Sequence, residues 1–355
     1  MRDHQMLILL LFYPEIILTS AFGSGLQADQ SSTLLMKVWM APLVFVGTPG
    51  NLLVVWTILK HVKQRSHTVL LILHLAAADL LVLITLPLWI YSLAHTWVFG
   101  EAACKVMAYI INACMFCSIF IITIMSVERF LAVRYPLKML YWQNRMPMSR
   151  TLAVTWALSF ILGIPVILTQ HLDDEDGVKH CLYRQYSSIS FEVLCMGLET
   201  LLGFVIPFFT IAICYCQVAV LLRKVRFRVK KSIFLICGVL VAFILCWLPY
   251  HILNVVGTVI LLVEQSDEQS HIPNSVVFIS GALAFISSSV NPVIYVFASK
   301  NFHGSLKKSG IVKLFQDLAA QTQQMTESFL QDSALQDEKI LEVPTSGEQK
   351  ELTDL

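Results

Sequence analysis

Seven separate stretches of about 20 or more mainly apolar residues dominate this sequence and restrict how it can fold. A helix of that length crosses the hydrocarbon core of a bilayer, because each residue of an α-helix rises about 1.5 Å. Only 14% of the residues are charged, against about 25% in soluble proteins, and the mean hydropathy is +0.70. We therefore predict an all-α membrane protein with a seven-transmembrane helix bundle. The predicted spans are 34–59, 68–91, 103–131, 151–168, 191–222, 232–256 and 276–298.

The charges between the predicted spans indicate how the chain is oriented. The segments after the first, third and fifth spans hold thirteen Lys and Arg residues and no Asp or Glu. The segments after the second, fourth and sixth spans hold two Lys and Arg residues and nine Asp and Glu residues. Lys and Arg concentrate on the cytoplasmic side of membrane proteins. We expect a multi-pass plasma-membrane protein with an extracellular N-terminus and a cytoplasmic C-terminus.

The two ends of the chain differ from the bundle of residues 34–299. Residues 1–33 are expected to be an extracellular tail, in which the apolar run 6–12 leaves a weak secretory signal open. Residues 300–320 have amphipathic spacing with interspersed lysines, which favours a helix on the inner membrane surface. The polar, acidic segment 321–355 is expected to be a disordered cytoplasmic tail.

Several function classes are disfavoured by composition and pattern. The net charge is +1 and no basic patch is interleaved with aromatic residues, so a nucleic-acid partner is not expected. No nucleophile–base pair or metal-ligand spacing occurs in the loops, so we expect neither an enzyme nor a bound cofactor. The absence of repeats and of mirrored broken spans argues against a transporter.

Polar side chains inside the predicted spans are expensive and therefore informative. Asp79 lies in the middle of the second span. If the spans converge there, one polar cluster surrounds this carboxylate, and it either holds a cation such as Na⁺ or is a hydrogen-bonded network without an ion. The other expected members of this cluster are Asn51, Ser118, Ser288 and Asn291.

The third span connects both faces of the membrane. Cys104 and Arg129 are 25 residues apart, or about 37 Å along a helix. Cys104 therefore lies at the outer end, and Glu128 and Arg129 reach the cytoplasmic interface. Cys181 is the only cysteine in the outer segment 169–190, an oxidising compartment, so we predict a Cys104–Cys181 disulfide.

Together, the motifs of all seven spans resemble the rhodopsin-like class of G-protein-coupled receptors, in order and spacing. The motifs are Gly50-Asn51, Leu75 to Asp79, Cys104, Glu128-Arg129-Phe130, Trp156, Cys181, Pro207 with Tyr215, Cys246-Trp247-Leu248-Pro249, and Asn291-Pro292-x-x-Tyr295. The resemblance implies a ligand-driven switch that couples to a heterotrimeric G protein of the inhibitory type. It also implies that arrestin and receptor kinases act on the tail.

The resemblance assigns roles in the switch. Glu128 would hold Arg129 at rest, and the sixth span would then swing outward about Pro249, next to Trp247. Tyr215 and Tyr295 would support the active arrangement. The start of the sixth span supplies no acid to restrain Arg129, so we expect appreciable ligand-independent activity.

Within that class, the sequence is most similar to the leukotriene B4 receptors, over spans one, five, six and seven. The resemblance implies a lipid chemoattractant, most simply leukotriene B4 or a related hydroxy-fatty acid. Such a ligand needs an apolar slot, a cation for its carboxylate and a few hydrogen-bonding groups. The candidate residues are the span residues Glu199, His251 and Asn254 and the cations Arg184 and Lys105.

Some positions depart from these relatives and leave alternatives open. Gln170 replaces an arginine, Ala108 a histidine and Phe116 a tyrosine of the leukotriene B4 receptor pattern. The acidic run 173–176 would repel a carboxylate and attract a basic peptide. Ile111 replaces the carboxylate of amine receptors, and span 276–298 lacks the lysine that binds retinal. A peptide chemoattractant receptor of the same class remains the main alternative, followed by a non-signalling decoy, a transporter or a channel.

Overall fold

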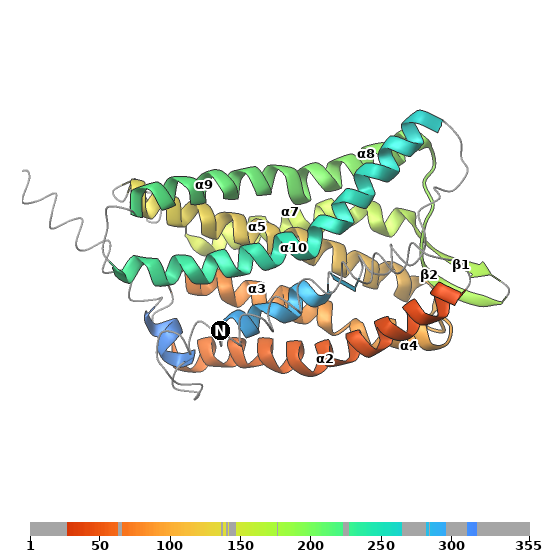
Figure 1. The fold of residues 1–355 in the computed structure, drawn as a ribbon, viewed down its shortest axis with the longest axis horizontal. Coiled ribbons are helices and arrows are strands. Elements are labelled where there is room, and N and C mark those ends of the chain that lie inside the picture. The colour runs from red at the N-terminus through yellow and green to blue at the C-terminus, as the bar shows by residue number, and fades with distance from the viewer. Residues whose placement is uncertain are drawn as a thin grey trace, which may run out of the picture.

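The computed structural model is a bundle of long helices with a short β-hairpin at one end (Figure 1). It describes residues 27–62, 66–135, 138–139, 141, 147–175, 177–222, 227–264, 282–283, 285–295 and 311–317. The predicted extracellular tail and the tail of residues 321–355 lie almost entirely outside these residues. We call the end of the bundle that carries the hairpin the hairpin end.

Among the described residues, six helical segments are long and apolar enough to cross a membrane, which confirms six of the predicted spans. Their membrane-spanning parts are Leu43–His61, His67–Ser92, Gly100–Arg134, Met148–Thr169, Ile189–Val218 and Ile244–Val263. The seventh predicted span, 276–298, is described only in part and is helical over 285–295. The helices are α2 (Gln27–His61), α3 (His67–Leu83), α4 (Leu86–Ala94), α5 (Gly100–Arg134), α7 (Met148–Thr169), α8 (Ile189–Thr200), α9 (Ile206–Leu222) and α10 (Phe227–Glu264).

The second span consists of two helices, α3 and α4, which are separated by the non-helical residues Ile84 and Thr85. Pro87 lies in the first turn of α4, where its missing N–H costs nothing. The Thr85 hydroxyl donates to the Val82 carbonyl oxygen at 2.7 Å and so satisfies part of the break. The span therefore bends without leaving its backbone groups unpaired.

The fifth span contains a π-helical turn, Leu201–Val205, between α8 and α9. The Ile206 N–H bonds the Leu201 carbonyl oxygen, five residues back instead of four. One extra residue is therefore accommodated, and α8 is rotated relative to α9 about the common axis. The sequence pattern did not predict this turn.

The segment after the fourth span forms an antiparallel hairpin that was not expected from the sequence. Strands β1 (Gln170–Glu175) and β2 (Val178–Arg184) are paired, with Gly177 at a positive φ of 82° in the turn. The disulfide between Cys104 of α5 and Cys181 of β2 is present, as predicted, and ties the hairpin to the bundle. The Trp97 N–H donates to the Lys179 carbonyl oxygen at 2.9 Å and adds a second attachment.

At the opposite end of the bundle, residues 311–317 form a helix within the predicted amphipathic segment. Its apolar residues Ile311, Leu314 and Phe315 are buried, while Lys313 is exposed. The Phe315 ring meets the Tyr295 ring edge-on with a centroid distance of 5.8 Å. The apolar face therefore packs against the helical bundle. The rest of segment 300–320 lies outside the described residues.

Candidate functional site

Glu199 is the centre of a buried polar cluster near the hairpin end. It is 8% exposed, and its carboxylate accepts three hydrogen bonds from three different elements. The donors are Asn112 Nδ2 of α5 at 2.6 Å, the Tyr250 hydroxyl of α10 at 2.8 Å and Arg184 Nη1 of β2 at 3.2 Å. A buried carboxylate needs such partners to remain charged. We call these four residues the Glu199 cluster.

The local fold explains how these residues meet. Glu199 lies at the end of α8, directly before the π turn that sets the rotation of that helix. Arg184 ends strand β2, three residues after the disulfide-bonded Cys181. The Gln185 N–H donates to the Thr169 carbonyl oxygen at 2.7 Å and fixes the chain just beyond Arg184. The disulfide and this backbone hydrogen bond therefore hold the Arg184 guanidinium at the hairpin end.

The charge of Arg184 is strongly stabilised by its neighbours. Burial by itself lowers the pKa of an arginine, but the nearby Tyr250 and Glu199 outweigh it and the pKa of Arg184 is raised. Burial raises the pKa of the neighbouring Tyr186 hydroxyl, and Arg184 partly opposes that shift. A fixed cation thus lies at the hairpin end, with Glu199 as its counter-ion.

His251 and Asn254 of α10 are buried nearby with unused hydrogen-bonding capacity. They are 2% and 8% exposed. Among the described residues, neither His251 Nε2 nor Asn254 Nδ2 has a hydrogen-bond partner. The His251 ring stacks on Phe204 of the π turn at a centroid distance of 5.0 Å, and its Nδ1 lies 3.5 Å from Thr200 Oγ1. The two side chains can therefore each still form a hydrogen bond.

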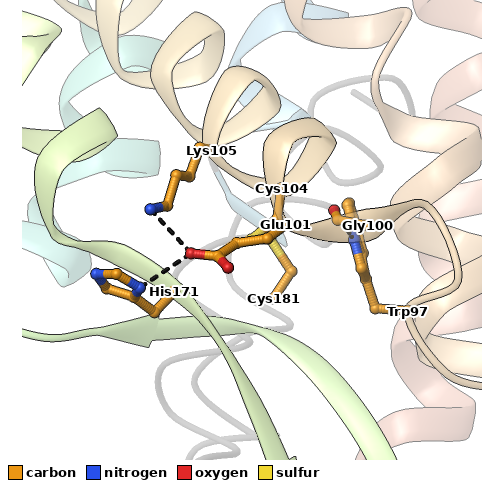
Figure 2. Close-up of a disulfide and its surroundings, with 7 residues drawn as sticks. All are labelled: Trp97, Gly100, Glu101, Cys104, Lys105, His171 and Cys181. Carbon is orange, nitrogen blue, oxygen red and sulfur yellow. Dashed lines mark hydrogen bonds and ion pairs between the residues drawn. A yellow bond between two sulfur atoms is a disulfide. The ribbon is translucent and has the colours of Figure 1, made fainter.

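Lys105 does not belong to the Glu199 cluster, although the sequence analysis placed it among the candidate ligand residues. Figure 2 shows its ammonium group beside the carboxylate of Glu101, one helical turn earlier on α5, at 2.8 Å. The same oxygen of Glu101 lies 3.0 Å from His171 Nδ1 of β1. The cluster next to the disulfide therefore joins the start of α5 to the hairpin.

Asn112 and Tyr250 were not among the predicted site residues. Asn112 is a polar residue in an apolar span, so the criterion that selected Glu199 also applies to it. Tyr250 gives no such signal, because a tyrosine in a span is ordinarily apolar packing with its hydroxyl near water. Only the folded arrangement brings its hydroxyl to Glu199.

A second polar cluster surrounds Asp79 deeper in the bundle. Asn291 Nδ2 donates to Asp79 Oδ2 at 2.8 Å. Both residues line a cavity of about 10 Å³ with Ser118 and Ser288, roughly the room that one water needs. Asn51 instead donates through Nδ2 to the Ser288 and Gly47 carbonyl oxygens. Oxygen atoms of this kind suit a hard cation such as Na⁺, stripped of its hydration shell.

The Asp79 cavity also borders the residues expected to move. Trp247 of α10 lines it, and the Trp247 ring meets Tyr250 edge-on with a centroid distance of 6.1 Å. Pro249 lies between them inside α10. The Glu199 cluster, the Trp247 ring and the Asp79 cavity therefore follow one another along the interior face of α10.

At the end opposite the hairpin, Glu128 and Arg129 have other partners than expected. Glu128 Oε1 lies 3.1 Å from His67 Nδ1, and no ion pair within 4.0 Å joins Glu128 to Arg129 in the described structure. Arg129 Nη2 donates instead to Thr68 Oγ1 at 2.9 Å. Glu128 still attracts Arg129 electrostatically, and Tyr215 of α9 also lies close enough to Arg129 to interact in this way. The Glu128 and Arg129 side chains thus each form their hydrogen bond with the first turn of α3.

The bundle, the tethered hairpin and the interior polar clusters define a seven-transmembrane receptor. Residues 50–295 match the family described as 7 transmembrane receptor (rhodopsin family), and the chain belongs to that family. It is 34% identical over 302 residues to leukotriene B4 receptor 1 of Rattus norvegicus, covering 84% of this chain and 86% of that protein. The human leukotriene B4 receptor 1 is 33% identical, with 79% and 80% covered. The C3a anaphylatoxin chemotactic receptor of Danio rerio is 29% identical, with 74% and 72% covered.

Family membership fixes the general function. The chain is a membrane-embedded G-protein-coupled receptor and not an enzyme. Its class implies a G-protein partner.

Proposed function

We propose that this receptor binds a carboxylate-bearing lipid, leukotriene B4 or a related hydroxy-fatty acid, at the Glu199 cluster. The observation that carries the proposal is the Arg184–Glu199 ion pair at the hairpin end of the bundle. An acidic lipid entering there would take over the Arg184 guanidinium from Glu199, because a carboxylate–guanidinium pair is a strong, directional contact. The hydroxyl groups of the lipid would then bond His251 and Asn254, which have capacity left.

Displacement of Glu199 would directly change its hydrogen bond with Tyr250 of α10. Glu199 accepts from the Tyr250 hydroxyl, and the Tyr250 ring contacts Trp247 beside Pro249. A ligand that changes the Glu199 contacts therefore changes a contact of the helix that must move. Arg129, supported by Tyr215 and Tyr295 in the active arrangement, would then engage an inhibitory-type G protein. Receptor kinases and arrestin would act on segment 321–355.

The remaining parts of the assignment follow from the charge pattern and the Asp79 cavity. The basic segments 60–67 and 134–150 favour a cytoplasmic location for the end opposite the hairpin. Residues 34–299 would form the receptor domain in the plasma membrane, with residues 1–33 outside and 300–355 inside. Asp79 would hold Na⁺ together with oxygen atoms of Ser118, Ser288 and Asn291, and this ion would stabilise the resting state.

The ligand assignment is tested by comparing a free acid with its methyl ester. Cells expressing the full chain are challenged with leukotriene B4, related hydroxy-fatty acids and their methyl esters, and calcium release and cAMP inhibition are recorded. We expect the wild type to respond to at least one acid and to prefer it over its ester by about tenfold, since one charge-assisted hydrogen-bond pair is lost in the ester.

Two variants assign that preference to the cluster. Arg184→Gln should abolish the preference for the acid, and Glu199→Gln should widen it, because the internal competitor for Arg184 is neutral. Lys105→Gln is the matched control and should change nothing, since Lys105 pairs with Glu101. Arg129→Ala should abolish signalling by every ligand. If the wild type and Arg184→Gln showed the same preference for the acid over its ester, the proposed carboxylate site would be contradicted.

A peptide chemoattractant is the alternative, favoured by the acidic strand β1 at the hairpin end. Asp174 is exposed on this strand and accepts a hydrogen bond from the Gly177 N–H at 3.1 Å. A basic peptide would be attracted to this strand. Silence to all lipids at normal surface expression, together with activation by basic peptides, would establish this alternative and leave the fold unchanged.

A further inference from the structure

The first turn of α3 separates Glu128 from Arg129, two residues that adjoin in sequence. Ser66 caps this turn, and its hydroxyl oxygen accepts from the Val69 N–H at 3.4 Å. The next two residues, His67 and Thr68, contact Glu128 and Arg129 near the end of α5. His67 takes the carboxylate and Thr68 takes the guanidinium. The two charges are thus held apart by one helix end.

Glu128 contacts His67 at the start of α3 at hydrogen-bonding distance. His67 Nδ1 lies 3.1 Å from the carboxylate, with side-chain exposures of 24% and 15%. The N-terminus of α3 adds a partial positive charge beside the same carboxylate. His67 therefore competes with Arg129 for the Glu128 carboxylate.

The Arg129 contact is much weaker than its environment demands. Arg129 is 6% exposed and Thr68 is 4% exposed. A guanidinium has five N–H donors, and a neutral hydroxyl is a modest acceptor for a buried cation. Within the described part of the chain, Arg129 Nε has no hydrogen-bond partner. A buried charge that is only partly satisfied is costly, so Arg129 is poised to leave.

No other carboxylate is available from the spans that would normally close on this arginine. Between Glu199 and Glu264 the sequence contains no Asp or Glu at all. The parts of the fifth and sixth spans that lie toward Arg129 therefore supply no acid to restrain it. Restraint has to come from Glu128 or from the α3 side.

We propose that His67 and Thr68 set the ligand-independent activity of this receptor in opposite directions. Thr68 holds Arg129 at rest, whereas His67 withdraws Glu128 from Arg129 and so weakens the restraint. Both are positioning residues that act through Arg129. The inference rests on the proposed role of Arg129 as the group that engages the G protein.

The test measures nucleotide exchange without any ligand. Membranes containing the full chain are mixed with an excess of purified inhibitory-type G protein, and GTPγS binding is normalised to receptor amount. Thr68→Val should raise the basal rate about threefold, because a hydrogen bond to a charged group is removed. His67→Ala should lower it by a similar factor, because Glu128 becomes free to pair with Arg129. A general loss of folding would move both variants downward.

Conservative variants and a matched control complete the test. Thr68→Ser and His67→Lys should restore wild-type rates, since each retains the contact. Thr155→Val on α7 is the control, because Thr155 is equally buried and its hydroxyl donates only to the Thr151 carbonyl oxygen of its own helix. The inference is overturned if Thr68→Val and His67→Ala shift the rate in the same direction or leave it unchanged. A normal basal rate in Arg129→Ala would instead refute the proposed role of Arg129.

Discussion

At the scale of single residues, the bundle stabilises its buried charges to very different degrees. Glu199 accepts from three donors on three elements, and Asp79 accepts from Asn291 beside a small cavity. Arg129 donates to a threonine hydroxyl. The best satisfied charge lies at the hairpin end and the least satisfied at the opposite end. The buried charge has more hydrogen-bond partners where a ligand would enter than where the switch would act.

Tyr250→Phe should destabilise the protein measurably although it removes only one oxygen atom. Glu199 would lose a donor at 2.8 Å while remaining buried, which costs about 1–3 kcal/mol and lowers the unfolding temperature by a few degrees. Thermal unfolding of the detergent-solubilised protein measures this. Tyr91→Phe on the exposed face of α4 is the matched control. Equal unfolding temperatures for the two variants would show that the Tyr250 hydroxyl does not support Glu199.

At the scale of elements, close packing depends on small residues where spans meet. A Cβ atom on Gly50 of α2 would lie 2.7 Å from Pro292 Cβ, and one on Gly47 would lie 2.5 Å from Ser289 Oγ. Proline has a rigid ring and cannot yield as a flexible side chain can. The first span therefore contacts helix 285–295 at a distance that only glycine permits.

Gly50→Ala should accordingly push the first span from helix 285–295 and lower the unfolding temperature by several degrees, against the usual gain of about 1 kcal/mol for alanine in a helix. Gly197→Ala on α8 is the control, because no atom lies within 4 Å of its added Cβ. That variant should be neutral or slightly more stable. Unfolding curves of both proteins decide the matter, and unchanged stability in Gly50→Ala would contradict the close approach.

The sequence predicted elements better than it predicted their ends and contacts. Apolar length identified the spans, because lipid demands it, but α10 begins at Phe227 and ends at Glu264, well beyond the predicted 232–256. Hydropathy predicts the part of a helix that lies in lipid, but not the turns that continue beyond the membrane. The Glu101–Lys105 pair is an i,i+4 pair within α5 that helix spacing alone could have indicated. The hairpin and the π turn depend on tertiary contacts or single backbone bonds. The same holds for His67, whose role needs α3 and α5 packed together.

At the scale of the whole molecule, α10 connects two polar regions of the bundle. It contributes Tyr250 to the Glu199 cluster and Trp247 to the Asp79 cavity, and the kink residue Pro249 lies between them. A proline inside a helix removes one backbone hydrogen bond and provides a point about which the rest of α10 can swing. A change near the hairpin can therefore be read at the other end of the bundle, where Arg129 lies.

If Asp79 holds Na⁺, stability should depend on which monovalent salt is present. The wild type should unfold ~2–4 °C higher in NaCl than in KCl of equal ionic strength, because a bound ion stabilises the folded state by mass action. Asp79→Asn should unfold at the same temperature in both salts. Ser126→Ala, a buried serine of α5 that donates to the carbonyl oxygen of Ile122, should retain the difference. Equal unfolding temperatures of the wild type in NaCl and KCl would show that the Asp79 cavity does not hold Na⁺.

The π turn in the fifth span also affects how this receptor can vary. One residue of an α-helix corresponds to about 100° of rotation, so the extra residue at Leu201–Val205 sets the phase of everything before it. Deleting a single residue there would barely shorten the span, yet Glu199 would turn out of the interior. The ligand chemistry at the hairpin end could therefore be exchanged by a change of length rather than of side chain, with the lower half of the bundle untouched.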